Sequence, residues 1–243
     1  MVRAGAGARM ARVDSSRSAC AALFLAILIP LPDRQGAVAP ELRDVLRRIQ
    51  TFYRSSPGIV AGFIQILESR TLPSRQEETG TLSLKAPGRM RWEYSRPRGK
   101  LAVTDGTKAY LYLPEDRAVL IGSVKDLDAG AVVARVLLGE ASLESEFQVE
   151  GEPAPHDPET WVLRLVPKTA GFPYDSLTAE VSSESGALRR LQMLDPLGNR
   201  MEYRFEDIRV EKNLPDRLFI FRIPRGAEIQ TFGGDREKAP SSP

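Results

Sequence analysis

Apolar side chains recur at helical spacing in one segment near the start of the chain. Between residues 41 and 56 they appear every three or four positions, and charged residues fill most of the other positions. This is the pattern of an amphipathic helix with one buried face. Pro57 and Gly58 follow directly, and this pair is typical of a helix end. We therefore predict a helix over 41–56 that packs against other elements through its apolar face.

From residue 59 onward the hydrophobic period changes from about 3.6 to two, which is the period of a β-strand. Turn signals such as Asp105-Gly106 separate the alternating runs at intervals typical of antiparallel hairpins. The predicted strands contain residues 63–67, 79–85, 90–94, 101–104, 110–113, 118–121, 147–149, 161–165, 176–181, 188–194, 201–205 and 219–223.

The segment 129–139 interrupts this alternation. It is rich in valine, leucine and alanine, has Arg135 as its one charged side chain, and ends at Gly139. These features predict a short, strongly apolar helix, which must cover an apolar surface. Many strands with a few apolar helices indicate a mainly β fold with some α. We predict a half-open antiparallel β-barrel of about 10–12 strands, with two or three helices as a lid in its concave face.

The first 39 residues have the features of an export signal. Four arginines precede an apolar run over 19–31, which is too short to span a bilayer as a helix, and the small residues Ala37-Val38-Ala39 follow. We predict a cleaved signal peptide over 1–39 and an exported protein; an uncleaved membrane anchor is the alternative. Residues 40–232 then form one domain, and the charged, Pro- and Ser-rich segment 233–243 forms a disordered tail.

Charge and cysteine content change once the leader is removed. The leader carries five of the 34 basic residues and two of the 32 acidic residues, so the rest of the chain is nearly neutral. The basic isoelectric point of 8.7 is therefore no argument for binding nucleic acid. The one cysteine, Cys20, lies in the leader, so the mature domain has no thiol for a disulfide or a metal site.

Residues for catalysis are also scarce. The one histidine, His156, lies in a loop between prolines. The sequence has no Gly-rich phosphate loop, no G-x-S-x-G elbow and no H-E-x-x-H motif. We therefore predict a binding protein and not an enzyme, with no cofactor and no metal; an unrecognised hydrolase is a distant alternative.

Several motifs occur in the order found in one family. Residues 84–97, Leu-Lys-Ala-Pro-Gly-Arg-Met-Arg-Trp-Glu-Tyr-Ser-Arg-Pro, resemble the signature strand pair of the LolA family of periplasmic outer-membrane lipoprotein carriers. The motifs that resemble further family landmarks are Phe63-x-Gln65, 103–112, 163–168, 194–199 and 219–229. The resemblance covers residues 40–230, and its motifs are individually weak but fairly specific when taken in order.

The resemblance implies a carrier in the periplasm that holds the acyl chains of lipoproteins in an apolar cavity between barrel and lid. It further implies a monomer that receives its cargo from an ATP-driven inner-membrane transporter and passes it to an acceptor lipoprotein in the outer membrane. Two alternatives remain: a lipid-binding sensor or regulatory module of the same fold, and a carrier of a glycolipid or polyketide.

Strand parity and the apolar middle segment give a set of candidate cavity or lid residues. These are Phe63, Leu84, Met90, Trp92, Tyr110, Tyr112, Leu137, Leu138, Met201 and Phe221. One position departs from the family pattern: Ala86 stands where studied members have an arginine that holds the lid closed. Lys85 or Arg89 could take over that role, although neither matches the local geometry of that arginine.

Overall fold

The computed structural model describes residues 40–71, 74–124, 137, 141–170 and 172–232. Its helices are α1 (Pro40–Ser55), the short α3 (Leu143–Glu146) and the 3-10 helix η2 (Asp216–Phe219). Its strands are β1 (Ile59–Glu68), β2 (Arg75–Lys85), β3 (Arg89–Arg96), β4 (Leu101–Asp105), β5 (Lys108–Leu113), β6 (Ala118–Ser123), β7 (Phe147–Ala154), β8 (Asp157–Pro167), β9 (Ser176–Ser182), β10 (Leu188–Leu194), β11 (Arg200–Val210) and β12 (Glu228–Thr231).

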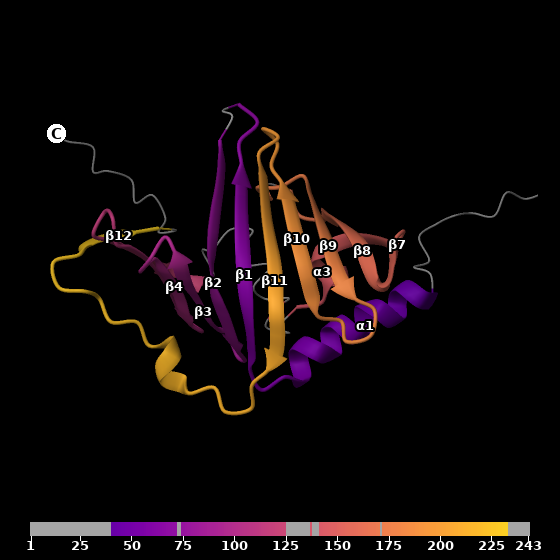
Figure 1. Cartoon of the computed structure of the whole chain (residues 1–243), viewed down its shortest axis with the longest axis horizontal. Helices are drawn as coiled ribbons and strands as arrows, with labels where there is room; N and C mark the ends of the chain where they lie inside the picture. Colours follow the sequence, from indigo (N-terminus) through magenta and orange to yellow (C-terminus); the bar gives the residue numbers. More distant parts are fainter. Residues whose placement is uncertain (1–39, 72–73, 125–136, 138–140, 171, 233–243) are drawn as a thin grey trace, which may run out of the picture. The chain divides into compact units, whose positions relative to one another are not determined.

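The strands form one open sheet in the order β12-β6-β5-β4-β3-β2-β1-β11-β10-β9-β8-β7 (Figure 1). All neighbours are antiparallel except β12, which pairs in parallel with β6. The pair β1 and β11 joins the strands β1 to β6 to the strands β7 to β11. The prediction of a mainly β fold with a large, mostly antiparallel open sheet is confirmed.

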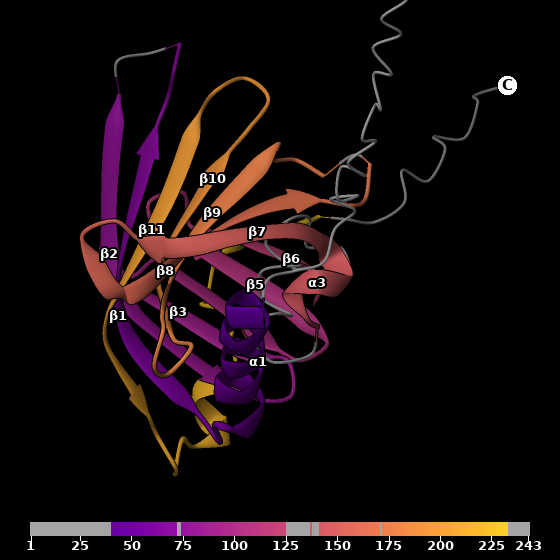
Figure 2. The ribbon, with the colours of Figure 1, turned by 90° about the vertical axis from the view of Figure 1, so that its right-hand side faces the viewer.

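Helix α1 lies against the inner side of the sheet, which curves around it (Figure 2). The face that the sequence predicts to be apolar is the buried one, and Ile49 and Tyr53 contact residues of β7 to β10. The Tyr53 hydroxyl accepts a hydrogen bond of 3.1 Å from the backbone N–H of Leu188. The β9–β10 turn touches the helix backbone at Gly186, whose φ is +78° and where a Cβ atom would lie 2.5 Å from Arg48. Glycine is required there for both reasons.

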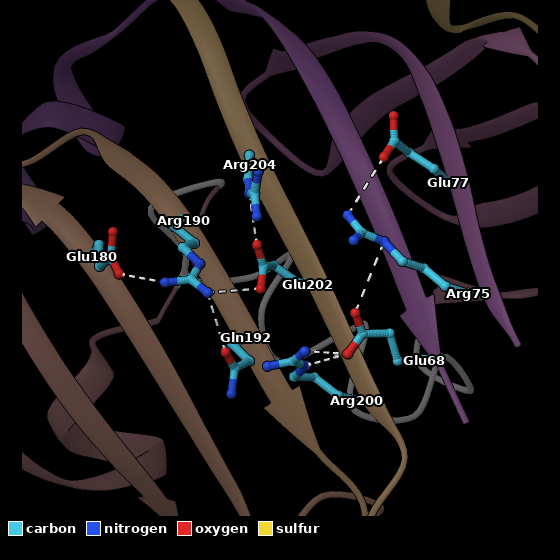
Figure 3. Close-up of polar contacts among 9 residues, drawn as sticks. All are labelled: Glu68, Arg75, Glu77, Glu180, Arg190, Gln192, Arg200, Glu202 and Arg204. Carbon is cyan, nitrogen blue, oxygen red and sulfur yellow. Dashed lines mark hydrogen bonds and ion pairs between the residues drawn. The ribbon is translucent and has the colours of Figure 1, made fainter. Parts of the chain in front are cut away.

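The outer side of the sheet carries charged side chains in ion pairs (Figure 3). The Glu202 carboxylate accepts hydrogen bonds from Arg190 at 2.8 Å and from Arg204 at 2.7 Å, and Arg190 also pairs with Glu180 on β9. Burial acts to raise the pKa of the Glu202 carboxyl, but the hydrogen bonds from the two arginines hold that pKa below its ordinary value. Since charged and apolar residues alternate along β10 and β11, a slip of one residue would turn the arginines inward, so the pattern fixes the register.

Eleven of the predicted strands match strands of the structure, but the prediction of a strand over 219–223 is wrong. Phe219 ends the helix η2, and the chain from residue 220 to 227 pairs with no strand. Phe219 is 1% exposed and packs on Val60, on the outer side of the sheet, whereas Ile220 is 62% exposed. Alternating apolar residues occur here because one side of an irregular segment packs on the sheet, not because the segment joins the sheet.

Two basic side chains attach this C-terminal segment to the outer side of the sheet. Lys85 Nζ and Arg89 Nη1 contact the Asp216 carboxylate at 2.6 Å and 2.7 Å, and Lys85 also donates to the carbonyl oxygen of Leu214. Lys85 and Arg89 are cross-strand partners on the face opposite Leu84 and therefore point away from the inner side. The hypothesis that either side chain replaces the family arginine at the lid is thus wrong for this structure.

Other sequence predictions fall outside the described residues. These are the leader 1–39, the tail 233–243 and, apart from Leu137, the apolar helix over 129–139. Leu137 itself is helical and 6% exposed. Among the described helices, none is long and apolar enough to cross a membrane.

We predict that Tyr53→Phe destabilises the domain. The substitution leaves the buried N–H of Leu188 without its hydrogen-bond acceptor, so the free energy of unfolding should fall by about 1–3 kcal/mol. Urea denaturation measures this difference. Tyr112→Phe is the matched control, because Tyr112 is only partly buried and a change within about 0.5 kcal/mol is expected there. Equal stability of the two variants would contradict the role of the Tyr53 hydroxyl.

A second prediction concerns Asp216 and pH. The hydrogen bond from Lys85 is the largest influence on the pKa of this carboxyl and, with Arg89, holds it below the ordinary value of 3.8 despite partial desolvation. A lowered folded-state pKa stabilises the folded state above pH 4, and this contribution is lost as the pH falls through the folded pKa. NMR titration of the Asp216 carboxyl carbon should give a low midpoint that rises in Lys85→Met. A midpoint unchanged by that substitution would refute the pairing.

Candidate ligand-binding cavity

The inner side of the sheet encloses a cavity of about 540 Å³. This volume is within the range of about 300–1,000 Å³ that is typical of small-molecule sites. The strands β1, β3, β4, β5, β6, β10 and β11 all contribute to its walls. Its described lining residues are Gln65, Met90, Trp92, Tyr94, Lys100, Ala102, Val103, Thr104, Ala109, Tyr110, Leu111, Leu120, Leu137, Tyr174, Leu191, Met193, Met201, Tyr203, Phe205 and Phe232.

Aromatic rings form one wall of the cavity. The Trp92 ring lies 5.2 Å from that of Tyr203 and 6.1 Å from that of Phe205, between centroids. Phe63 lies behind this layer and meets Trp92 and Tyr94 edge to face, at 4.9 Å and 5.0 Å. Edge-to-face and stacked rings at these distances stabilise one another beyond the area that they bury. The wall is therefore firmly supported.

Methionine side chains are concentrated in the cavity. All three methionines of the described chain, Met90, Met193 and Met201, line it, and Met193 and Met201 are direct partners across the β10–β11 pair. An unbranched, polarisable thioether adapts its shape more readily than a branched aliphatic side chain. The cavity thus combines a stiff aromatic wall with a flexible thioether wall, which suits a ligand of variable shape.

A small polar group interrupts the apolar surface at one place. Tyr94 donates a hydrogen bond of 2.9 Å from its hydroxyl to Gln65 Oε1, and Gln65 is 5% exposed. Beside them Lys100 Nζ contacts Glu78 Oε2 at 2.6 Å and lies 4.4 Å from the centroid of the Tyr94 ring. Burial, and next the charge of Glu78, raise the pKa of the Tyr94 hydroxyl, so Tyr94 stays protonated at every physiological pH.

Five of the residues predicted from sequence line the cavity: Met90, Trp92, Tyr110, Leu137 and Met201. Two others, Phe63 and Leu84, belong to the buried core directly behind the lining. Leu138 lies outside the described residues.

For Tyr110, Tyr112 and Phe221 the structure differs from the inward strand parity on which the prediction was based, although Tyr110 does line the cavity. Tyr110 lies opposite Val103 on β4, and Val103 lies opposite Arg91 on β3. Arg91 faces outward, where it donates to the carbonyl oxygen of Leu218. The rings of Tyr110 and Tyr112 therefore point outward as well. Tyr110 borders the cavity, but its ring stacks on Phe221 on the outer side, with centroids 5.2 Å apart. Strand β5 is apolar at every position from 109 to 113, so its sequence cannot indicate which set faces inward.

Other lining residues were not predicted. Leu191 and Met193 alternate with Arg190 and Gln192 along β10, and this pattern could have identified them. Phe232 has no such signal. Its backbone N–H donates to Ile121, and its ring occupies the space where a Cβ atom on Gly122 would lie, within 2.4 Å. This ring reaches the cavity only because the C-terminal segment returns to pair with β6 through β12.

The described lining of the cavity is predominantly apolar. Within the described ranges, no three His, Cys, Asp or Glu side chains gather closely enough to hold a metal ion. The described lining is mostly hydrocarbon, aromatic rings and thioethers, and its polar side chains include the group described above together with Thr104, Tyr174 and Tyr203. Such a cavity can bind an apolar molecule by removing its surface from water.

We predict that Ala102→Phe weakens the binding of an apolar probe. Ala102 faces inward beside Trp92 and Leu111, so a larger ring would occupy part of the cavity. Titration with diphenylhexatriene, a fluorescent hydrocarbon, should show severalfold weaker binding. The control is Leu101→Phe, which adds a ring on the opposite face of the same strand and should leave probe binding unchanged. Equal affinity of the two variants would refute this cavity as the binding site.

Comparison with known proteins gives a consistent result. The chain is 29% identical over 202 residues to the outer-membrane lipoprotein carrier protein of Dechloromonas aromatica, covering 83% of this chain and 91% of the relative. It is 35% identical over 162 residues to that of Chromohalobacter salexigens, covering 65% and 73%. Among solved structures, the crystal structure of MucB matches with a TM-score of 0.50 and 13% identity, over 77% of this chain and 66% of that one, which supports the fold alone.

A family model also matches most of the chain. Residues 54–222 match the model of the family described as outer membrane lipoprotein carrier protein LolA. This range extends from the end of α1 to the segment after η2 and so includes β1 to β11, which build most of the cavity. The chain therefore belongs to the LolA family.

Proposed function

We propose that this protein is a carrier of lipoproteins, which holds the acyl chains of its cargo in the cavity while the cargo moves from the inner to the outer membrane. The observation that carries the proposal is an apolar cavity of about 540 Å³ in a member of the LolA family. The relatives are named outer-membrane lipoprotein carrier proteins, which supports the same function.

The energetics of an acyl chain explain why a carrier is needed. Burial of a chain of about 16 carbons is worth about 12 kcal/mol at roughly 0.8 kcal/mol per methylene. Release of a lipoprotein into water is therefore prohibitively slow without a protein that offsets this cost. The carrier must also release its cargo again, and a wall of thioethers that adapts to several chain arrangements favours moderate affinity over a single tight fit.

The place and the partners of the carrier follow from this role. We propose that residues 1–39 direct export and that the protein acts in the periplasm as a non-catalytic monomer. An ATP-driven transporter of the inner membrane would load it, and an acceptor lipoprotein of the outer membrane would take over the cargo. These partners rest on family membership and on the need for an energy source, because loading removes acyl chains from a bilayer that stabilises them.

We predict that Leu137→Glu abolishes co-purification of a lipidated client. Leu137 is 6% exposed and lines the cavity, so the substitution places a carboxylate where acyl chains would lie. An ionised carboxylate in apolar surroundings costs several kcal/mol, which a bound chain cannot restore. Leu197→Glu is the control, since Leu197 is 71% exposed in the β10–β11 turn. A folded Leu137→Glu protein that still retains its client would contradict the proposal.

The same preparation identifies the cargo. Native mass spectrometry of the protein from its source envelope, followed by lipid extraction, should yield acylated peptides. Recovery of free glycolipid or polyketide in place of acylated peptides would show that the cargo is not a lipoprotein. An empty cavity together with no binding of synthetic lipopeptide would refute the carrier function itself.

A further inference from the structure

The group formed by Gln65, Tyr94, Lys100 and Glu78, which we call the polar cluster, is out of place in an apolar cavity. Its members come from β1, β2, β3 and the residue preceding β4. Register places Glu78 directly opposite Gln65 on the inner side, and the backbone N–H of Tyr94 donates to the carbonyl oxygen of Lys100. Four separate segments thus converge on one point of the cavity wall.

The cluster leaves hydrogen-bond donors that face the cavity. Gln65 Oε1 is occupied by the Tyr94 hydroxyl, whereas Gln65 Nε2 has no hydrogen bond to any described residue, although the side chain is 95% buried and lines the cavity. Lys100 has three N–H donors, and its one hydrogen-bond partner within the described ranges is Glu78. Because Gln65 and Lys100 line the cavity, these donors are open to it and can be used by the polar group of a bound ligand.

The charge of the cluster restricts what this ligand can be. Lys100 and Glu78 form a close pair with side chains only 18% and 16% exposed, so together they add no net charge to the cavity. A ligand that carries a negative charge would meet the Glu78 carboxylate beside its cation, in surroundings that screen poorly. A neutral acceptor gains hydrogen bonds from Lys100 and Gln65 without that repulsion. The best match is a carbonyl oxygen.

We propose that Gln65 and Lys100 bind the carbonyl oxygen of a neutral acyl linkage, an ester or an amide, and so fix the head of the lipid at the polar cluster. The acyl chain then extends along the apolar lining toward Met90, Leu137 and Leu191. This inference rests on the proposed lipid-carrier function and deepens it. The cavity recognises an acylated molecule by its linkage as well as by its hydrocarbon.

The test compares two synthetic lipopeptides with identical chains. One carries S-(2,3-dipalmitoyloxypropyl)cysteine, with two ester carbonyls, and the other carries the dihexadecyl ether analogue, which has none. Both are measured by displacement of diphenylhexatriene from the purified protein. We expect the ester to bind at least fivefold more tightly than the ether, which is the scale of one or two hydrogen bonds in an apolar site.

The variants assign this preference to the cluster. Tyr94→Phe keeps the donors of Gln65 and should keep the preference for the ester. Gln65→Leu combined with Tyr94→Phe removes the donors of Gln65 without leaving a tyrosine hydroxyl unpaired, and should reduce the preference for the ester severalfold relative to Tyr94→Phe. Tyr94→Phe is thus a matched control for packing and folding.

Three results would overturn the inference. Equal binding of ester and ether by the unmodified protein would show that the carbonyl is not recognised, although the carrier function would stand because both lipids bind. Tighter binding of free palmitate than of the ester would identify an anion site in place of a neutral one. If neither lipopeptide displaces the hydrocarbon probe, the carrier function itself fails, and the inference fails with it.

Discussion

The constraint on which this fold depends is the mismatch between a wide sheet and a short helix. Twelve strands spaced about 4.8 Å apart extend over roughly 53 Å, whereas the 16 residues of α1 measure about 24 Å. The helix therefore covers the inner side of β7 to β10 and contributes no residue to the described lining of the cavity. Where α1 does not cover it, the apolar side of the sheet must either be packed against other residues or enclose a cavity. Here the aromatic layer around Trp92 supports the second outcome, because Phe63, Tyr203 and Phe205 brace it from behind and beside.

The outer side of the sheet carries charged residues where the inner side carries apolar ones. Its charged residues make that side polar, and the ion pairs around Glu202 tie β9, β10 and β11 together, while Leu191, Met193 and Met201 on the inner side of β10 and β11 line the cavity. The segment after β11 covers the remaining apolar residues of the outer side, where Phe219 packs on Val60 and Lys85 holds Asp216. Strands β10 and β11 thus carry ion pairs on the outer side and cavity-lining residues on the inner side.

Period-two alternation was sufficient to predict most strands and the inward set Met90, Trp92 and Met201, because on those strands the opposite face is charged. It failed where both faces are apolar. On β5, Tyr110 and Leu111 are equally hydrophobic, and only the path of the C-terminal segment decides which of them is covered from outside. The same segment was mistaken for a strand, because an irregular chain that packs on a sheet through one side also alternates. The polar cluster was not predictable, since its members are far apart in sequence and become neighbours only through the register of β1, β2 and β3.

The place of Phe232 has a consequence for the size of the cavity. This ring fills the space over Gly122 but is held by β12, a strand of four exposed residues that pairs with β6 alone. Short exposed segments of this kind have the lowest local unfolding free energy in a domain. The wall at this edge is therefore compliant: a bulkier guest can push the ring aside by unpairing a few backbone hydrogen bonds, while the aromatic wall around Trp92 keeps its shape. The cavity wall is therefore rigid around Trp92 and can move at the β6–β12 edge, so the cavity can hold ligands over a range of volumes.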